Sequence, residues 1–371
     1  MNNDNLKKIV GLRHELHAHP ELSSREEWTK NRLMEFLKRH TDLEIVDKGA
    51  WFYAFYHAGA GRRTIAFRAD MDAVPIDEVI ELTYGSRFPG VSHKCGHDGH
   101  CAALCGFAME VSQNGAGCNI YFLFQHAEET AEGAVACAPL MKEKGIDEIF
   151  CCHNMPGYPL NSVAVIDGTI CCASKGMIIS LIGTPAHASL PESGKNPSFA
   201  IAALINSIPG LIAPEKYQGL VLCTIIQVSI GERAFGVSAS AGALLLTIRG
   251  QYESEMNALQ VQLENITQAE ADKYGLGYSF DFCDIFPETR NHKESSDKVR
   301  ASCQKLGLRL VEMKEPLRSS EDFGYFTKEI KGAAFFVGNG AEYPPIHTAE
   351  YDFPDETLET PIEMFKALSG L

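Results

Sequence analysis

Three apolar segments of this chain share one design, in which a buried-strand pattern is followed at once by acidic or imidazole side chains. The segments are TIAFRADMDAVPI (64–76), CNIYFLFQHAEE (118–129) and DEIFCCHNMPG (147–157). Helical patterns separate them, and strands that alternate with helices favour a parallel sheet with helices on its faces. Since the carboxyl ends of parallel strands meet at one edge of a sheet, we expect a functional site along that edge.

The N-terminal segment shows helical rather than strand periodicity. Ile9, Leu12 and Leu16 follow the spacing of one buried helix face. A second amphipathic helix is expected after Ser23 and Ser24, with acidic residues in its first turn.

Length and a change of pattern in the middle of the chain predict two domains. A chain of 371 residues exceeds an ordinary single core. From about 174 the pattern runs strand, helix, two strands, helix and strand, which suits a small α+β domain. We therefore predict a two-domain α/β fold. Its parts are a discontinuous α/β domain (1–173 and 287–371), which carries the expected site, and an inserted smaller α+β domain (174–286).

Charge and cysteine usage exclude several classes of protein. The net charge of −15 argues against nucleic acid or an anionic membrane as a partner, because both attract clustered lysine and arginine. No segment approaches the roughly 18 apolar residues of a membrane helix, and the N-terminus does not read as a signal peptide. Twelve cysteines, many inside apolar runs, favour reduced thiols. We expect a cytoplasmic protein that acts on small molecules.

The polar strand ends carry side chains suited to a transition-metal site. HKCGHDGHCA (93–102) contributes Cys95 and His97, the end of the second strand contributes Glu128 and Glu129, the third strand ends on His153, and a late loop holds His347. Thiolate, imidazole and carboxylate groups are ligands for Zn, Mn, Co and Ni. Adjacent carboxylates repel each other unless a cation lies between them, so Glu129 can bind metal while Glu128 serves as a general base.

Each of these pieces also has a plain structural interpretation. His153 alone could be a hydrogen-bonded buried residue, and Asp98 in CGHDGH could cap a helix. A disulfide-exchange site is a weaker alternative, because Cys95 and Cys101 lack the Cys-x-x-Cys spacing. Four strand ends of one ligand chemistry favour a shared metal site over four separate structural roles.

Seven motifs, in order along the chain, resemble those of the M20 metallopeptidase superfamily. They are RADMDAVPI, KCGHDGHCA, FQHAEE, CCHNMP, GTPAHASLP, SSEDFGYF and PPIHTAEYDF. The resemblance is closest to the amidohydrolase branch, which includes aminoacylases, hippurate hydrolases, auxin-conjugate hydrolases and N-acetyldiaminopimelate deacetylases. It covers nearly the whole chain, beginning at LRHELHAHPELS.

The resemblance implies a catalytic domain with two divalent metal ions, of identity left open among Mn, Zn, Co and Ni, and an inserted lid that in many relatives also dimerises. It implies that the metal ligands are Cys95, His97, Glu129, His153 and His347. Glu128 would be the general base, and His187 of GTPAHAS would steady the oxyanion. Hydrogen bonds that orient the ligands would come from Asp70, Asp72, Asp98 and His100.

The implied reaction is hydrolysis of an amide. Metal-bound hydroxide would attack the carbonyl, Glu128 would take the proton of the water and pass it to the departing amine, and His187 would stabilise the oxyanion. The substrate would be an N-acyl amino acid, cleaved to a carboxylic acid and a free amino acid. Arg249 is a candidate for binding a substrate carboxylate, with a surface ion pair as the alternative interpretation.

Two positions depart from the motifs of the resembled branch. His126 stands where relatives usually have proline. Gly236 stands where the branch usually carries an asparagine ahead of GTIR, and Ser238 or Ser240 could replace the missing amide. Two alternatives remain. One is a dipeptidase or carboxypeptidase of the same superfamily, and the other, supported by the Gly236 departure, is a non-catalytic descendant that binds metal or ligand.

Overall fold

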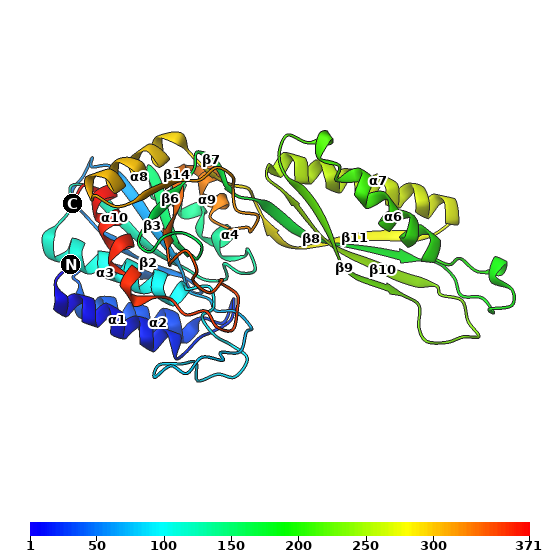
Figure 1. The fold of residues 1–371 in the computed structure, drawn as a ribbon, viewed down its shortest axis with the longest axis horizontal. Coiled ribbons are helices and arrows are strands. Elements are labelled where there is room, and N and C mark those ends of the chain that lie inside the picture. The colour runs from blue at the N-terminus through cyan, green and yellow to red at the C-terminus, as the bar shows by residue number, and fades with distance from the viewer. The chain divides into compact units, whose positions relative to one another are not determined.

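The computed structural model describes all 371 residues, which divide into two compact units (Figure 1). The first unit comprises Met1–Ile170, Thr289–Pro316 and Glu321–Leu371. The second comprises Cys171–Glu288 and the short segment Leu317–Ser320. The predicted α/β fold with an inserted smaller α+β domain is confirmed, and the structure adds Leu317–Ser320 to the inserted unit.

The first unit is built on an eight-stranded sheet of order β1-β2-β4-β3-β5-β14-β6-β13. The four central strands β4, β3, β5 and β14 are parallel to one another, so their carboxyl ends share one edge. The strands are β1 (Glu44–Asp47), β2 (Phe52–Tyr56), β3 (Thr64–Asp70), β4 (Asn119–Gln125), β5 (Glu148–Met155), β6 (Val163–Val165), β13 (Leu310–Glu312) and β14 (Lys331–Gly338). A separate two-stranded sheet pairs β7 (Gly168–Cys171) with β12 (Thr289–Asn291).

Helices complete the first unit around this sheet (Figure 1). They are α1 (Asn3–His17), α2 (Glu27–His40), α3 (His97–Asn114), α4 (Gly133–Cys137), α5 (Pro139–Glu143), α8 (Lys293–Lys305), α9 (Gly324–Glu329) and α10 (Glu359–Ser369). The buried face of α1 includes Ile9, Leu12 and Leu16, as their spacing predicts.

Helix α3 is buried from His97 to Val111 because it packs between the sheet, α1 and α10. Gly96, which precedes it, has φ +97°, and an added Cβ there would collide with the side chain of Asn154. At Gly99 a Cβ would collide with the ring of Phe353. Glycine at these two positions therefore lets the start of α3 approach the site edge of the sheet closely.

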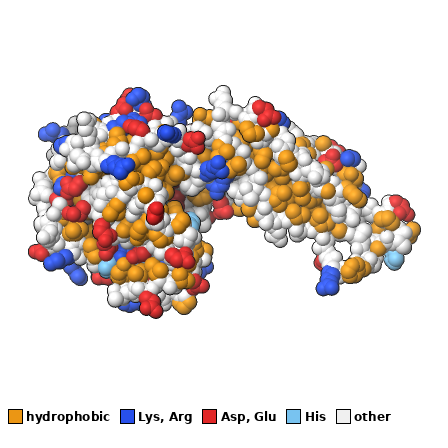
Figure 2. All heavy atoms as spheres, viewed as in Figure 1, with side chains coloured by type: hydrophobic (Ala, Val, Ile, Leu, Met, Phe, Trp, Pro, Cys, Tyr) orange, Lys and Arg blue, Asp and Glu red, His pale blue; other side chains and the backbone are white.

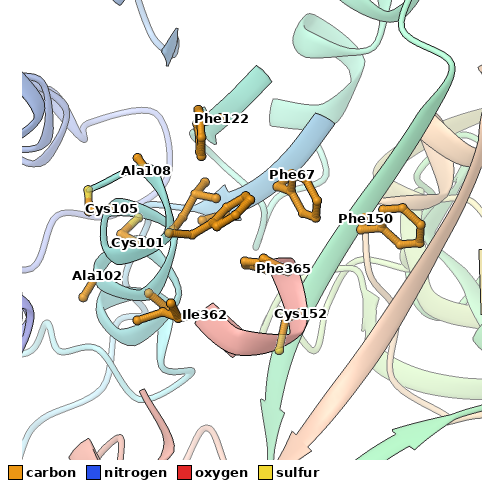
Figure 3. Packing of buried hydrophobic residues seen from close by; sticks show 14 of the residues in the cluster. Phe67, Cys101, Ala102, Cys105, Ala108, Phe122, Phe150, Cys152, Ile362 and Phe365 are labelled. Atoms are coloured by element: carbon orange, nitrogen blue, oxygen red, sulfur yellow. The ribbon is translucent and has the colours of Figure 1, made fainter. Parts of the chain in front are cut away.

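Aromatic rings fill the space between α3, α10 and the sheet (Figure 3). Phe67 of β3 lies 4.9 Å from Phe107 of α3 and 5.0 Å from Phe365 of α10, measured between ring centroids. All three rings are at most 2% exposed. Burial of each phenyl ring contributes about 2–3 kcal/mol. This cluster therefore holds α3, which begins at His97, against β3.

The second unit is a four-stranded antiparallel sheet of order β11-β8-β10-β9 with two long helices. The strands are β8 (Ala173–Ile182), β9 (Val221–Ile230), β10 (Ala241–Gly250) and β11 (Gly277–Phe286), and the helices are α6 (Ser198–Leu211) and α7 (Glu253–Tyr274). Its own apolar core lies between the helices and one sheet face, with Ile179, Leu204 and Leu263 fully buried. In neither unit does any helix combine the length and apolar character that crossing a membrane requires.

Candidate metal centre

The predicted metal ligands come from four segments that end at the same edge of the central sheet. Cys95 and His97 lie in the turn into α3, Glu129 follows β4, His153 belongs to β5, and His347 lies in the loop after β14. The parallel arrangement of β4, β5 and β14 explains why residues so distant in sequence converge.

Donor atoms of these residues form overlapping groups. In one group, the donors of Cys95, His97 and His153 all lie within 4.8 Å of one another, and a second group contains Cys95, Glu129 and His347. The Cys95 sulfur is 3.5 Å from Nε2 of His153. His347 Nε2 is 3.1 Å from Oε1 of Glu129. Because Cys95 belongs to both groups, the geometry suits two neighbouring ions that share one ligand.

The hydrogen bonds of two imidazoles fit the requirements of a metal ligand. Nδ1 of His97 donates to the carbonyl oxygen of Asp72 at 2.9 Å, and Nδ1 of His153 donates to the carbonyl oxygen of Asn154 at 2.7 Å. A carbonyl only accepts, so Nδ1 carries a hydrogen in each ring, and Nε2 is the nitrogen left to face a metal ion. Nε2 of His97 is buried without any hydrogen-bond partner. A divalent cation satisfies this orphaned nitrogen, so the residues present fit the metal that the resemblance implies.

Burial shapes the ionisation of the acidic groups here. Burial, with the charge of Glu129 adding to it, raises the pKa of the Cys95 thiol, so a thiolate at this position requires a nearby cation. Burial followed by the charge of Glu321 raises the pKa of Glu128 well above the usual range for glutamate. Glu128 is 6% exposed and receives only a long hydrogen bond, 3.4 Å, from the backbone of Asp322. Its carboxyl group therefore has no strong hydrogen-bond partner inside the protein.

Asp70 and Asp72 contact residues of the candidate metal centre without belonging to the predicted ligand set. Asp70 accepts from Nδ1 of His100 at 2.6 Å and from Arg68 at 2.6 Å. Asp72 accepts from the backbone N–H of Glu129 at 2.9 Å, and its other oxygen lies 3.3 Å from Nδ1 of His97. These carboxylates are placed to orient ligands through hydrogen bonds, as the resemblance implies for them.

Asp98 does not cap α3, which was the alternative interpretation of CGHDGH. Its carboxylate accepts hydrogen bonds from Nδ1 of His17 at 2.8 Å and from Arg13 at 3.3 Å. Both partners are completely buried on α1. Asp98 thus ties the first turn of α3 to α1.

A polar chain that the sequence motifs do not predict lies beneath the donors. Nε2 of His100 lies 2.6 Å from Oδ1 of Asn154, whose amide nitrogen donates to the hydroxyl of Tyr351 at 2.6 Å. Asn154 directly follows His153, and Tyr351 belongs to the same motif as His347. The signal was therefore present in the quoted motifs, but nothing in their spacing shows that the two side chains meet.

His187 and Arg249 belong to the second unit. His187 lies in an exposed loop whose backbone pairs with Val237, and its Nδ1 is 2.7 Å from the hydroxyl of Ser189. Arg249, near the end of β10, donates to the carbonyl oxygen of Arg318 at 3.1 Å and to Ser320 at 2.9 Å. It makes no ion pair, so the surface ion-pair interpretation is wrong. Its role toward a substrate, like that of His187, stays a prediction.

The two departures from the resembled motifs have different surroundings. His126 is 7% exposed and its Nδ1 has no hydrogen-bond partner. Gly236 accepts a backbone hydrogen bond from Ala188 at 3.0 Å, and an added Cβ would meet no atom within 4 Å. The loop beside His187 therefore has room for a side chain that this chain lacks.

Comparison with known proteins supports the resemblance. The sequence model described as Peptidase family M20/M25/M40 matches residues 66–369. An N-acetyldiaminopimelate deacetylase of Priestia megaterium is 28% identical over 343 residues, covering 91% of each chain. An N-acetylcysteine deacetylase of Bacillus subtilis is 27% identical over 370 residues, covering 98% of this chain and 96% of the relative.

Solved structures show the same fold. A protein from methicillin-resistant Staphylococcus aureus superimposes with a TM-score of 0.91 at 24% identity, covering 98% of this chain and 96% of the other. The Bacillus subtilis YXEP protein, described as a dinuclear metal-binding peptidase, gives a TM-score of 0.85 at 24% identity, with 99% and 98% covered.

Proposed function

The chain belongs to peptidase family M20/M25/M40, and we propose that it hydrolyses the amide bond of N-acyl amino acids to a carboxylic acid and a free amino acid. The convergence of the Cys95, His97, Glu129, His153 and His347 donors beside the buried carboxyl group of Glu128 carries this proposal. Two relatives that cover nearly the whole chain are named as deacetylases of N-acetylated amino acids, which supports the substrate class.

Two divalent ions are the cofactors that the donor set favours, with Mn, Zn, Co and Ni all compatible with thiolate, imidazole and carboxylate ligands. When bound, such ions lower the pKa of water toward ~7 and polarise the acyl carbonyl. We assign Cys95, His97, Glu129, His153 and His347 to hold them. Asp72 fixes the orientation of two of these ligands, because it bonds the backbone of Glu129 and lies against His97.

Glu128 moves the proton in the proposed reaction. Its carboxylate takes a proton from the attacking water and delivers it to the nitrogen of the departing amine. Burial, followed by the charges of Glu321, Glu129 and Asp322, raises the pKa of this carboxyl group and so its affinity for the proton in transit. For His187 we keep the role that the resemblance implies, donation of a hydrogen bond to the oxyanion.

The second unit offers a surface for a homodimer. Strand β9 is an edge of the sheet, with Ile225, Ile226 and Val228 between 40% and 59% exposed. Figure 2 shows apolar side chains gathered on this unit. An exposed apolar edge strand pairs readily with a second chain, so we propose assembly of two copies through β9. A monomer by light scattering at micromolar concentration would count against it.

A substrate panel tests the proposed reaction. Protein loaded separately with Mn, Zn, Co or Ni is incubated with N-acetyl amino acids and, in parallel, with unmodified dipeptides. We expect release of free amino acid from the N-acetyl series with at least one metal. Preferential dipeptide cleavage would make the protein a dipeptidase instead, and failure of both panels with fully metallated protein would point to a non-catalytic binding role.

A further inference from the structure

A hollow of about 370 Å³ lies on the first unit, between the start of α2 and the loop that contains Phe88. Its walls include His19, Leu22, Arg25 and Trp28. We call it the Trp28 pocket. Its volume falls in the range of about 300–1,000 Å³ typical of small-molecule sites, and none of the assigned metal ligands lines it.

One wall of the Trp28 pocket is aromatic and held in place. The ring of His19 stacks on Trp28 with 4.2 Å between ring centroids and 24° between ring planes. Phe88, which is 48% exposed, lies 6.1 Å from His19 at a tilted angle. Glu21 accepts a hydrogen bond from the backbone N–H of Trp28 at 3.1 Å. These contacts present flat apolar surface against which a planar ring can pack.

The ring of His19 is held in this wall by contacts at both of its nitrogens. Its Nδ1 is 3.0 Å from the carbonyl oxygen of Glu15, which can only accept, so Nδ1 carries the hydrogen. Its Nε2 is 3.3 Å from Nη1 of Arg87, which can only donate, so Nε2 is the acceptor. These contacts fix the orientation of the stacked imidazole and place the guanidinium of Arg87 beside it.

The charge in the pocket wall is not neutralised by the chain. Arg25 is exposed, and its guanidinium makes no hydrogen bond or ion pair with another residue. The one acidic side chain in the wall, Glu21, has its two carboxylate oxygens engaged by the backbone N–H groups of Trp28 and Thr29, at 3.1 and 2.8 Å. In a chain of net charge −15, a free guanidinium beside stacked aromatic rings is complementary to an anion that carries a ring.

We propose that the Trp28 pocket binds a small aromatic carboxylate, with its ring against the His19–Trp28 stack and its carboxylate on Arg25. This adds a ligand site to the proposed hydrolase that is separate from the metal centre. It does not depend on the hydrolytic function, because it rests only on the contacts of the segment 19–28 and the Phe88 loop.

The chain has two tryptophans, Trp28 and Trp51, which makes a local test possible. In a metal-loaded Trp51→Phe protein, Trp28 is the only indole reporter. We expect benzoate to change its fluorescence in a saturable way. Cyclohexanecarboxylate, which lacks the π system, and benzyl alcohol, which lacks the charge, should each bind about tenfold more weakly.

Substitution of Arg25 separates this pocket from other places where benzoate can bind. Arg25→Gln in the Trp51→Phe background should weaken the benzoate titration about tenfold, whereas Arg62→Gln, at an exposed arginine outside the pocket, should leave it unchanged. The proposal is overturned if no saturable change occurs, if Arg25→Gln has no effect, or if cyclohexanecarboxylate binds as well as benzoate. Inhibition of hydrolysis by benzoate without any Trp28 signal would place benzoate at the metal centre instead.

Discussion

The sulfur of Cys95 lies 3.5 Å from Nε2 of His153, although 58 positions of sequence separate the two residues. Cys95 is fixed by the turn that opens α3, and His153 by its place in β5. Since Nδ1 of His153 already donates to a carbonyl oxygen, Nε2 presents its lone pair beside the sulfur. One thiol and one imidazole therefore converge on a single point from two separate elements, which is what chelation of a metal requires.

Replacement of Cys95 tests this convergence directly. Cys95→Ser removes the sulfur shared by both donor groups, so we expect the loss of at least one of two metal ions per chain after dialysis, measured by elemental analysis. Cys283→Ser, at an exposed cysteine of the second unit, is the matched control and should keep the full complement. Unchanged metal content in Cys95→Ser would remove this residue from the ligand set.

Glu128→Gln separates proton transfer from metal binding. The amide cannot act as a base, so kcat should fall by at least ~100-fold, the usual contribution of a positioned general base. Metal content should stay at the wild-type value, because Glu129 remains. Glu132→Gln, four residues further along at an exposed position, should retain activity. Near-normal turnover of metal-loaded Glu128→Gln would falsify the proposed role.

Glu26 predicts a pH dependence of stability. Burial, reinforced by the charge of Asp72, raises the pKa of Glu26 from 4.5 to about 7. The folded protein therefore holds this proton more tightly than the unfolded chain, and stability falls as pH rises from 4.5 to about 7. Glu26→Gln removes that loss. The change in the free energy of unfolding caused by this substitution should be more favourable at pH 8 than at pH 5, by about 1–3 kcal/mol. Melting temperatures at both pH values, with exposed Glu27→Gln as control, check this.

His17 predicts the opposite dependence. Burial alone would lower the pKa of His17, but its hydrogen bonds to Asp98 and Glu78 outweigh burial and raise the pKa to about 9. The charged imidazole then contributes stability that is complete below pH 6.5 and is lost as pH rises through about 9. His17→Gln should lower the free energy of unfolding by about 3 kcal/mol at pH 6 and by clearly less at pH 10. Exposed His57→Gln should show neither the cost nor its pH dependence in the same thermal scans.

Gly99→Ala tests the close approach of α3 to the C-terminal region. The added methyl group would collide with the ring of Phe353, and overpacking of this kind costs about 1–3 kcal/mol. Gly117→Ala is the matched control, since a Cβ there meets no atom within 4 Å. Equal melting temperatures for the two variants would show that Phe353 moves aside without cost.

The sequence predicted the site edge because of a property of parallel strands. Glu129 and His153 each follow or end a buried apolar run, and the carboxyl ends of neighbouring parallel strands necessarily meet. The six-element pattern of the insert was likewise recoverable, because each strand and helix of the second unit has its own periodicity.

Contacts between side chains remote in sequence could not be predicted. The bond of Asn154 to Tyr351 depends on where the loop after β14 lies over β5, which no local pattern encodes. The start of α2 is a further example. Ser23 and Ser24 precede the helix, yet it is the carboxylate of Glu21 that accepts from backbone N–H groups of its first turn, those of Trp28 and Thr29.

The donors of the metal centre lie on segments that meet only when the central sheet is complete. An ion bound there acts as a ligand of the native state alone, so by mass action it stabilises that state by RT ln(1 + [M]/Kd). The melting temperature of the first unit is thereby coupled to the free metal concentration, and each tenfold excess over Kd adds about 1.4 kcal/mol. If the five proposed ligands hold such ions, a cell short of that metal would hold less folded protein, and the proposed metal centre would couple the lifetime of the chain to ion supply.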